Sequence, residues 1–340
     1  MEKRLLLAFV LSAAILLAWS VIFPPPQRTV PQPPQEAGQP VLEESPEPLP
    51  ETAAVESSDD DSETSPVGPI VAEGSSVEET VLLENDYISV ELTNRGAAVA
   101  AYLLTGYNGD DGLPLDLVQT VPLQARTYPL QLMTPEGPDQ ALYALERTAD
   151  GVIFRWADGL GNGVEKHIEL AAGGYGLDVE IYATGTLSGA RVSIGSGMRD
   201  LGEKEQDSRL ALWGEGIVLA DGEVERFKRK KIKEPRILTP ASVSFAGFED
   251  AYFLNVLRPQ VGVSEIRIEP QEVPNGEDEP NTVLQISVAP NRGELRGQLL
   301  GAPKEYDLLR EIGGGIEKTL DFGIFSPISV FFLKALRWIY

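Results

Sequence analysis

Apolar and polar residues alternate with a period of two through much of residues 81–302, and this pattern constrains the fold more than any other feature of the chain. In NDYISVELTN, Ile88, Val90 and Leu92 fall on one face of an extended segment. The segments GLDVEIYATG, GVIFRWADG, GVEKHIELAAGG and TVLQISVAP alternate similarly, each bounded by Gly, Pro, Asn or Asp. Successive side chains of a strand point to opposite faces, so these segments are typical of half-buried strands. We therefore predict a mainly β fold, a large antiparallel β-sandwich whose length indicates extended or doubled sheets.

The N-terminus carries a different signal. Lys3 and Arg4 precede an uncharged apolar run from Leu5 to Phe23. As a helix this run would be about 28 Å long, which matches the hydrocarbon core of a bilayer. A cleaved signal peptide is the alternative, but its apolar core is usually shorter, and this run continues past the candidate cleavage site AWS. We predict a cytoplasmic start and a transmembrane anchor over residues 1–23, with the main domain in the periplasm of a bacterium.

Residues 24–80 are rich in Pro, Glu, Ser and Asp and contain few large apolar side chains, so we predict a disordered acidic linker. The acidic run Asp59–Asp61 belongs to this linker and is interpreted as solvated rather than as a cation site. The chain as a whole has a net charge of −24, which disfavours nucleic acid as a partner.

The scarcity of reactive side chains limits the possible chemistry. The chain has no Cys and a single His, which excludes disulfides, thiolate zinc sites and catalysis by paired histidines. His167 alternates with Glu165 and Glu169 onto the predicted solvated face of its strand. The predicted core face of the same strand carries Val164, Ile168 and Leu170. We therefore predict no catalytic, cofactor-binding or metal-binding residues, and no enzyme.

One segment concentrates positive charge in this acidic chain. ERFKRKKIK, residues 225–233, contains six basic residues. It could contact lipid headgroups or an acidic partner. The interpretation that we favour is a solvated strand or hairpin whose charges are offset by acidic neighbours.

The C-terminal region reads as two helical segments. PKEYDLLREI predicts a helix with Pro303 in its first turn, ended by the glycines of a hinge, so that residues 303–323 form a linker helix and hinge. Beyond it, ISVFFLKALRWIY is too short to span a bilayer, and we predict an interfacial amphipathic helix over residues 324–340. A buried core helix is the alternative. The candidate membrane-interface residues are Phe331, Phe332, Lys334, Arg337 and Trp338.

Three of these stretches, in this order, resemble the N-terminal part of the YidC/Oxa/Alb family of bacterial membrane protein insertases. ENDYISVELTNRGAAVAAYLLTGY is similar to the family's opening strands, with Gly96-Ala97 in place of a pair of glycines. FAGFEDAYFLNVLRP is similar to an aromatic stretch in which Phe245 or Phe248 replaces the usual Trp. LLGAPKEYDLLREI with LDFGIFSPISVFFLKALRWIY is similar to the run that leads into the family's membrane core.

The resemblance implies a periplasmic, mutarotase-like β-supersandwich without catalysis or cofactors. It also implies a role in the insertion, folding and assembly of inner-membrane proteins, alone or with the Sec translocon. The implied partners are membrane lipids, nascent inner-membrane proteins and Sec translocon components. The family's insertion core of further transmembrane helices has no counterpart in this sequence, so we expect a fragment or a truncated reading frame.

Two other functions fit the residues. One is a membrane-tethered periplasmic β-sandwich that binds or modifies carbohydrate, which a groove lined by exposed aromatic residues and convergent carboxylates would favour. The other is a structural scaffold of the cell envelope, which copurification with Sec components would contradict.

Overall fold

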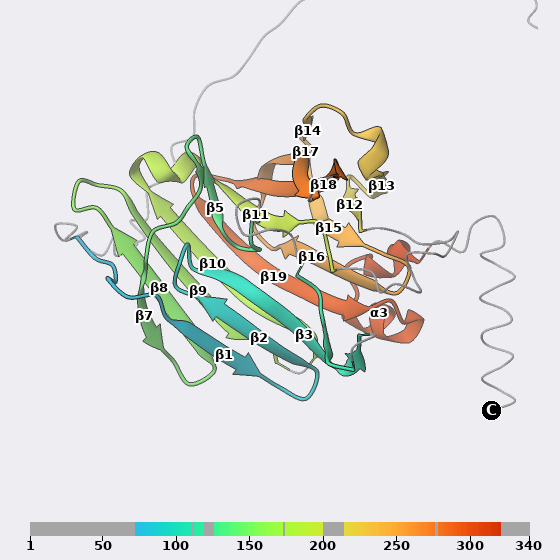
Figure 1. Ribbon diagram of the computed structural model, residues 1–340, viewed down its shortest axis with the longest axis horizontal. Coiled ribbons are helices and arrows are strands. Elements are labelled where there is room, and N and C mark those ends of the chain that lie inside the picture. The colour runs from blue at the N-terminus through green and yellow to red at the C-terminus, as the bar shows by residue number, and fades with distance from the viewer. Residues whose placement is uncertain are drawn as a thin grey trace, which may run out of the picture. The chain divides into compact units, whose positions relative to one another are not determined.

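The computed structural model describes residues 72–109, 112–118, 126–172, 174–199, 214–275 and 278–320. These residues form antiparallel sheets arranged in two packed layers (Figure 1). The prediction of a mainly β fold with antiparallel sheets is thereby confirmed. The predicted anchor, most of the predicted linker and the predicted interfacial helix lie outside the described residues. Within the part of the chain that is described, no helix is long and apolar enough to cross a membrane.

The larger layer is a nine-stranded sheet. Its strands, in order across the sheet, are β13 (Glu223–Phe227), β12 (Glu215–Ala220), β15 (Val243–Glu249), β16 (Phe253–Pro259), β19 (Glu294–Pro303), β10 (Gly176–Thr184), β9 (Gly163–Leu170), β8 (Gly151–Ala157) and β7 (Ala144–Arg147). The central pair β10 and β19 runs antiparallel in register from Gly176 opposite Leu300 to Tyr182 opposite Glu294.

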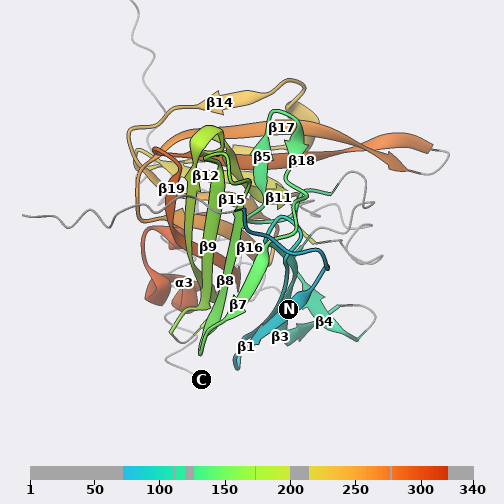
Figure 2. The same ribbon diagram turned by 90° about the vertical axis from the view of Figure 1, so that its left-hand side faces the viewer.

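Two smaller sheets form the facing layer. The four-stranded sheet has the order β1 (Thr80–Glu84), β2 (Ile88–Thr93), β3 (Ala98–Asn108) and β4 (Pro114–Asp116). The six-stranded sheet has the order β14 (Arg236–Leu238), β17 (Val263–Asn275), β18 (Asp278–Pro290), β11 (Arg191–Ser196), β5 (Leu132–Thr134) and β6 (Gly137–Pro138). Figure 2 shows β1, β3 and β4 below β5 and β11 on this side of the molecule.

The main core lies between the two layers and follows the alternation of the sequence. Ile88, Val90 and Leu92 of β2 have no exposed surface, and Leu177, Val179 and Ile181 of β10 are buried with them. Such burial supplies about 2 kcal/mol for each large aliphatic side chain. Tyr102 of β3 ties the layers together, because its hydroxyl donates a hydrogen bond to the carbonyl oxygen of Tyr175 beside β10. The period of two therefore identified which faces of these strands are buried.

Three short helices and one longer one complete the described part. They are η1 (Gly185–Gly189), η2 (Arg229–Lys231), α3 (Tyr306–Ile312) and η3 (Ile316–Thr319). The helix predicted in PKEYDLLREI is thus present, but Pro303 is the last residue of β19 rather than part of the first helical turn. Sheet pairing prevails here because Pro303 lies opposite Phe253 of β16. Gly313 ends α3 with φ of +68°, a left-handed conformation that favours glycine.

Candidate functional site

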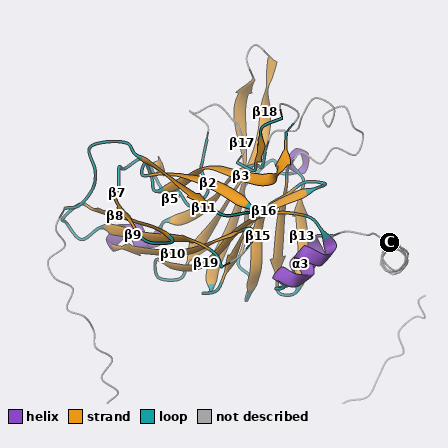
Figure 3. Ribbon diagram, turned by 90° about the horizontal axis from the view of Figure 1, so that it is seen from below, coloured by secondary structure: helices purple, strands orange, loops and turns teal. Residues whose placement is uncertain are grey.

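The candidate functional site is the junction where the β domain meets its C-terminal segment. After β19 the chain turns back as α3 and η3, which cover the outer face of the nine-stranded sheet (Figure 3). Leu309 of α3 and Ile316 of η3 have no exposed surface. They pack in a second apolar cluster against residues of β12, β15, β16 and β19: Ile217, Leu219, Phe245, Leu254, Val256, Leu300 and Ala302. Strands β15 and β16 are therefore buried on both faces, which accounts for their nearly continuous apolar sequence.

Phe245 and Phe248 of β15 divide between the two cores. Phe245 packs beneath the C-terminal segment in the second cluster, and Phe248 points into the main core between the layers. Both are fully buried. The aromatic stretch FAGFEDAYFLNVLRP therefore contributes side chains to both apolar clusters, and its strand β15 lies between them.

Two consecutive carboxylates form the polar part of the junction. Glu249 ends β15 with a side chain that is 2% exposed, and it accepts hydrogen bonds from Arg226 Nε (2.6 Å) and Lys304 Nζ (2.9 Å). Lys304, the first residue after β19, also donates to the backbone carbonyl of Asp250 at 3.1 Å. Charge-assisted bonds of this kind hold the start of the C-terminal segment against the turn between β15 and β16.

The side chain of Asp250 stabilises the turn between β15 and β16 by hydrogen bonds. Its Oδ1 accepts hydrogen bonds from the backbone N–H groups of Tyr252 and Phe253, both at 2.7 Å, and its Oδ2 accepts one from Arg199 Nε at 2.6 Å. Burial raises the pKa of Asp250, while the Arg199 guanidinium and the two N–H groups act in the opposite direction. The Arg199 side chain is 4% exposed and also lies over the Phe253 ring at 5.1 Å. Loss of either partner would leave the other as an uncompensated buried charge.

Arginines from two strands bind the far end of the segment. Arg258 of β16 donates to the carbonyl oxygens of Ile312 and Gly313 at 3.4 Å, where α3 leaves its last carbonyls without helical partners. Arg226 of β13 donates to the carbonyl oxygen of Thr319 at 3.0 Å. In the opposite direction, Lys318 Nζ donates a hydrogen bond to the carbonyl oxygen of Gly222 at 3.2 Å. The segment is therefore fixed at its start, at the helix end and at its last described turn.

Two hollows flank the junction. One, of about 330 Å³, lies between the β15–β16 turn and the start of the segment, where Tyr107 donates to Glu305 Oε1 at 2.5 Å. The other, of about 650 Å³, lies beside α3 and is lined by Tyr87, Tyr175 and Asp178 among others. The two tyrosine rings are 5.0 Å apart, and Asp178 accepts a hydrogen bond from Gln298. Both hollows adjoin the elements that bind the segment.

A buried lysine that sequence reasoning missed lies inside the main core. Lys166 of β9 has no exposed surface, and its Nζ donates to the carbonyl oxygens of Gly96 (2.7 Å), Ala97 (3.0 Å) and Leu130 (2.7 Å). Burial lowers the pKa of Lys166 to about 7, against the opposing effect of the Asp139 carboxylate. Its ammonium also lies 5.4 Å from the centre of the Tyr143 ring. Lys166 shares its strand face with Val164 and Ile168, so the alternation itself pointed inward, although its charge argued otherwise.

His167 lies on the face of β9 opposite Val164 and Ile168, as predicted. It is half-buried, and its Nε2 is 2.5 Å from Glu165 Oε1. Val164 and Ile168 are buried in the main core, and Leu170 is half-buried and packs against it, so all three face the core as predicted. Among the described residues no group of three or more acidic or histidine side chains could hold a metal ion.

The basic segment ERFKRKKIK divides between β13 and η2. Arg226 pairs with Glu249, and Lys228 lies 3.6 Å from Glu215, so the predicted offset by acidic neighbours applies to these two. Phe227 and Ile232 are buried and fix the segment to the domain. The predicted membrane-interface residues cannot be compared in this way, because Phe331, Phe332, Lys334, Arg337 and Trp338 lie outside the described residues.

Comparisons with known proteins point to one family. A family model described as the YidC periplasmic domain matches residues 80–335. Proteins named membrane protein insertase YidC match 100% of this chain in Geobacter metallireducens at 26% identity, in Syntrophus aciditrophicus at 26% and in Geotalea uraniireducens at 22%. The chain spans 64%, 66% and 64% of the length of these relatives, respectively.

Solved structures give a weaker likeness. A galactose mutarotase-like protein from Lactobacillus casei aligns with a TM-score of 0.36 at 8% identity, covering 66% of this chain and 100% of that one. A galactose mutarotase-related enzyme from Lactobacillus acidophilus aligns with a TM-score of 0.27 at 9% identity, covering 66% and 97%. Likenesses at this level carry no argument about activity.

Proposed function

The chain belongs to the YidC family, since the family's periplasmic-domain model covers most of its length, and on this premise we propose that it acts as part of a membrane protein insertase. In this role it assists inner-membrane proteins to insert, fold and assemble, alone or beside the Sec translocon. The mechanism is nonenzymatic: an insertase lowers the desolvation cost of moving polar segments into lipid. The family match is the observation that carries this proposal.

We propose that the β domain serves this role by holding the C-terminal segment in a fixed orientation. The junction supports this view. Lys304 at the start of the segment binds Glu249, and Arg258 and Arg226 bind carbonyl oxygens of the segment farther along. Residues 324–340, with Phe331, Phe332, Lys334, Arg337 and Trp338, would then lie as an interfacial helix at the periplasmic face of the inner membrane.

The remaining parts of the chain have assigned roles in the same proposal. Residues 1–23 form a transmembrane anchor with a cytoplasmic N-terminus, residues 24–80 form a linker, residues 81–302 form the periplasmic sandwich and residues 303–323 form the linker helix and hinge. The proposed partners are membrane lipids, nascent inner-membrane proteins and Sec components.

Depletion of the protein in its own cells tests the function. With its gene under a regulated promoter, depletion should leave inner-membrane proteins accessible to protease on the wrong side of the membrane, while export of a soluble periplasmic protein continues. Unimpaired insertion after depletion would contradict the proposal. Expression of the 340-residue chain alone in depleted cells then measures how much of the activity it supplies.

The carbohydrate-binding alternative is not favoured, because the matched relatives are named as insertases. The tyrosine pair in the hollow beside α3 is the feature that a glycan would use. Binding of the purified chain to a glycan array, abolished by Tyr87→Ala, would revive that alternative.

A further inference from the structure

The loop between β13 and β14 concentrates positive charge that the insertase role does not use. From Lys228 to Arg236 the sequence is KRKKIKEPR, with a single carboxylate, Glu234, among its basic residues. Lys230, Lys231, Lys233 and Arg236 are all exposed. Within the described part of the chain, no hydrogen bond or ion pair holds the side chains of these four.

The loop is fixed to the domain at two points. Phe227 at its start and Ile232 in its middle are 5% and 6% exposed and pack in the main core. Arg229 lies between the exposed lysines in η2 and is half-buried.

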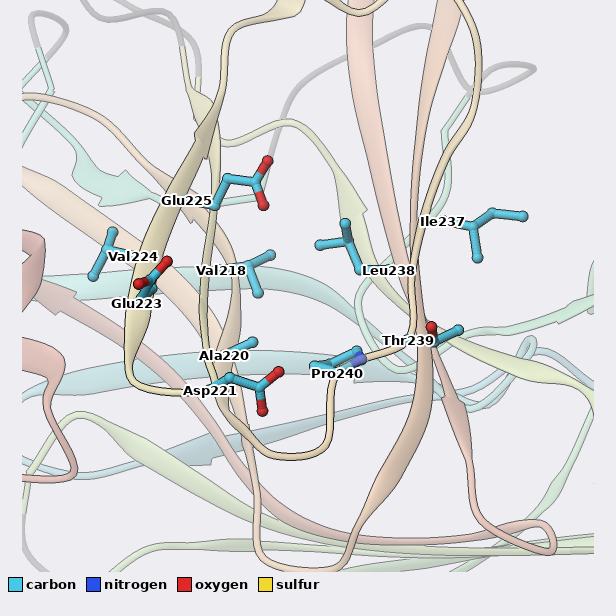
Figure 4. Close-up of a pocket in the computed structure, with 10 residues that line it drawn as sticks. All are labelled: Val218, Ala220, Asp221, Glu223, Val224, Glu225, Ile237, Leu238, Thr239 and Pro240. Carbon is cyan, nitrogen blue, oxygen red and sulfur yellow. The ribbon is translucent and has the colours of Figure 1, made fainter. Parts of the chain in front are cut away.

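Acidic residues of the same hairpin lie beside the basic cluster. Asp221, Glu223 and Glu225 line a hollow of about 490 Å³ between the β12–β13 hairpin and residues 237–240. Ile237 and Leu238 line the same hollow from the side of β14 (Figure 4). Ile237 is 54% exposed, so an apolar side chain adjoins the basic cluster. The outer surface of the loop is therefore both cationic and apolar.

The loop also lies near the point where the described chain ends. Arg226, two residues before the loop, donates to the carbonyl oxygen of Thr319, and Lys318 donates to Gly222 at the other end of β13. In Figure 1, β13 and α3 lie at the same end of the molecule. The start of the basic loop therefore lies close to Thr319, near the last described residue of the chain.

We propose that the basic segment formed by this loop and the first two residues of β14, residues 228–237, binds anionic phospholipid headgroups and turns this end of the β domain toward the membrane. The proposal rests on the insertase function above, which brings the domain to a membrane. An acidic chain is repelled by an anionic surface, so a local cationic patch determines which end approaches it. The exposed Ile237 adds apolar contact at the headgroup level.

A single label on the whole chain tests the proposal. The chain has no cysteine, so Ile237→Cys gives one site for a nitroxide label. The labelled chain is reconstituted in nanodiscs of phosphatidylcholine, or of an equal mixture with phosphatidylglycerol. We expect the label to be shielded from a water-soluble relaxing agent in the anionic discs alone, and to be released when salt shortens the Debye length to about 3 Å.

Charge reversal provides the matched comparison. Lys230→Glu with Lys231→Glu should reduce the shielded population by about 25-fold or more, since each basic residue near an anionic surface contributes about fivefold in affinity. Arg147→Glu with Arg292→Glu changes the net charge equally at exposed sites away from the loop and should leave the shielding unchanged. Equal loss in both pairs would mean a general charge effect and would overturn the proposal.

A second label separates this proposal from the function on which it rests. A nitroxide at Phe331→Cys reports on the proposed interfacial helix. Shielding at residue 331 but not at 237 would refute the loop and leave the insertase role intact, whereas exposure of both would count against the membrane orientation altogether. Shielding of residue 237 in native membranes but not in protein-free anionic discs would identify an acidic protein as the partner and refute lipid.

Discussion

Buried cationic side chains occur both in the main core and at the junction of the β domain, and the groups that accept their hydrogen bonds differ between the two sites. In the main core, Lys166 donates to three backbone carbonyl oxygens. At the junction, Arg199 and Lys304 donate to the carboxylates of Asp250 and Glu249. A carboxylate offsets more of the cost of burying a cation than a neutral carbonyl does. The core site is therefore the one where charge is least stabilised, and burial lowers the pKa of Lys166 to about 7 there.

The two sites differ in what they connect. Lys166 joins β9 to two loops of the facing layer, so it fixes the interior of the sandwich. The junction joins the β15–β16 turn to a segment that leaves the domain. Removal of a carboxylate at the junction leaves a buried unpaired cation, whereas removal of Lys166 from the core leaves only neutral carbonyl groups. The loss in the free energy of unfolding should therefore be larger at the junction.

Asp250→Ala should give the largest effect. It leaves the Arg199 guanidinium buried without its carboxylate and removes the acceptor for two backbone N–H groups. We expect a loss of about 3–5 kcal/mol in the free energy of unfolding, measured by urea titration of the whole chain in detergent with circular dichroism of the strands. Asp221→Ala is the control, because Asp221 also accepts two backbone N–H bonds but is exposed, and its loss should be much smaller. Equal losses would show that the buried charge is unimportant.

Lys166→Met should have an intermediate effect. Methionine fills a similar volume and removes a buried charge, but it leaves three carbonyl oxygens without their donor, so we expect a loss of about 2 kcal/mol at neutral pH. The same urea titration measures it, with the exposed Lys230→Met as a control that should be neutral. A variant as stable as the parent chain would mean that the carbonyl groups find other donors.

The pH dependence of stability should distinguish the two sites further. The unfolded pKa of lysine is about 10.4, whereas burial lowers the folded pKa of Lys166 to about 7. Between these values the unfolded chain binds more protons, so the free energy of unfolding should rise with pH, by about 1 kcal/mol per unit from pH 7 to 9. Lys166→Met should lack this rise, and a rise retained in the variant would assign it to other groups. Measurements should stop below about pH 10, because burial raises the pKa of Tyr102 and Tyr143, which reverses the trend.

Ala97→Gly should give the smallest change in the free energy of unfolding, and this change should be an increase. Ala97 adopts φ of +46°, next to Gly96 at +68°, and both carbonyl oxygens accept from Lys166. A left-handed alanine is strained by about 1 kcal/mol, so glycine should stabilise the chain by about 0.5 kcal/mol after its greater unfolded-state entropy is counted. Ala98→Gly, one residue later in β3, should destabilise it. If both variants lose stability alike, the turn beneath Lys166 is not strained.

Local pattern predicted the fold better than it predicted the junction. Alternation assigned the buried faces of β2 and β10, because a half-buried strand leaves a direct record in its sequence. It placed Lys166 on the buried face of β9, but the charge of a lysine argues against burial, and the acceptors that permit it lie 36 to 70 residues away in the chain. Glu249 and Asp250 were passed over for the same reason: their partners Arg199, Arg226 and Lys304 come from three separate parts of the chain. The aromatic residues around them were noticed, and the structure shows that these line both cores.

The bonds of Lys166 also bear on the order of folding. Its ammonium reaches the carbonyl oxygens of Gly96 and Leu130 only after β9 has been laid across the facing layer, because those residues precede it by 70 and 36 positions. Until then the side chain remains hydrated and charged, and it contributes nothing to a partly assembled sheet. Contacts that form after the transition state chiefly slow unfolding. We therefore expect the bonds of Lys166 to have little influence on the folding rate of the sandwich and to slow its unfolding.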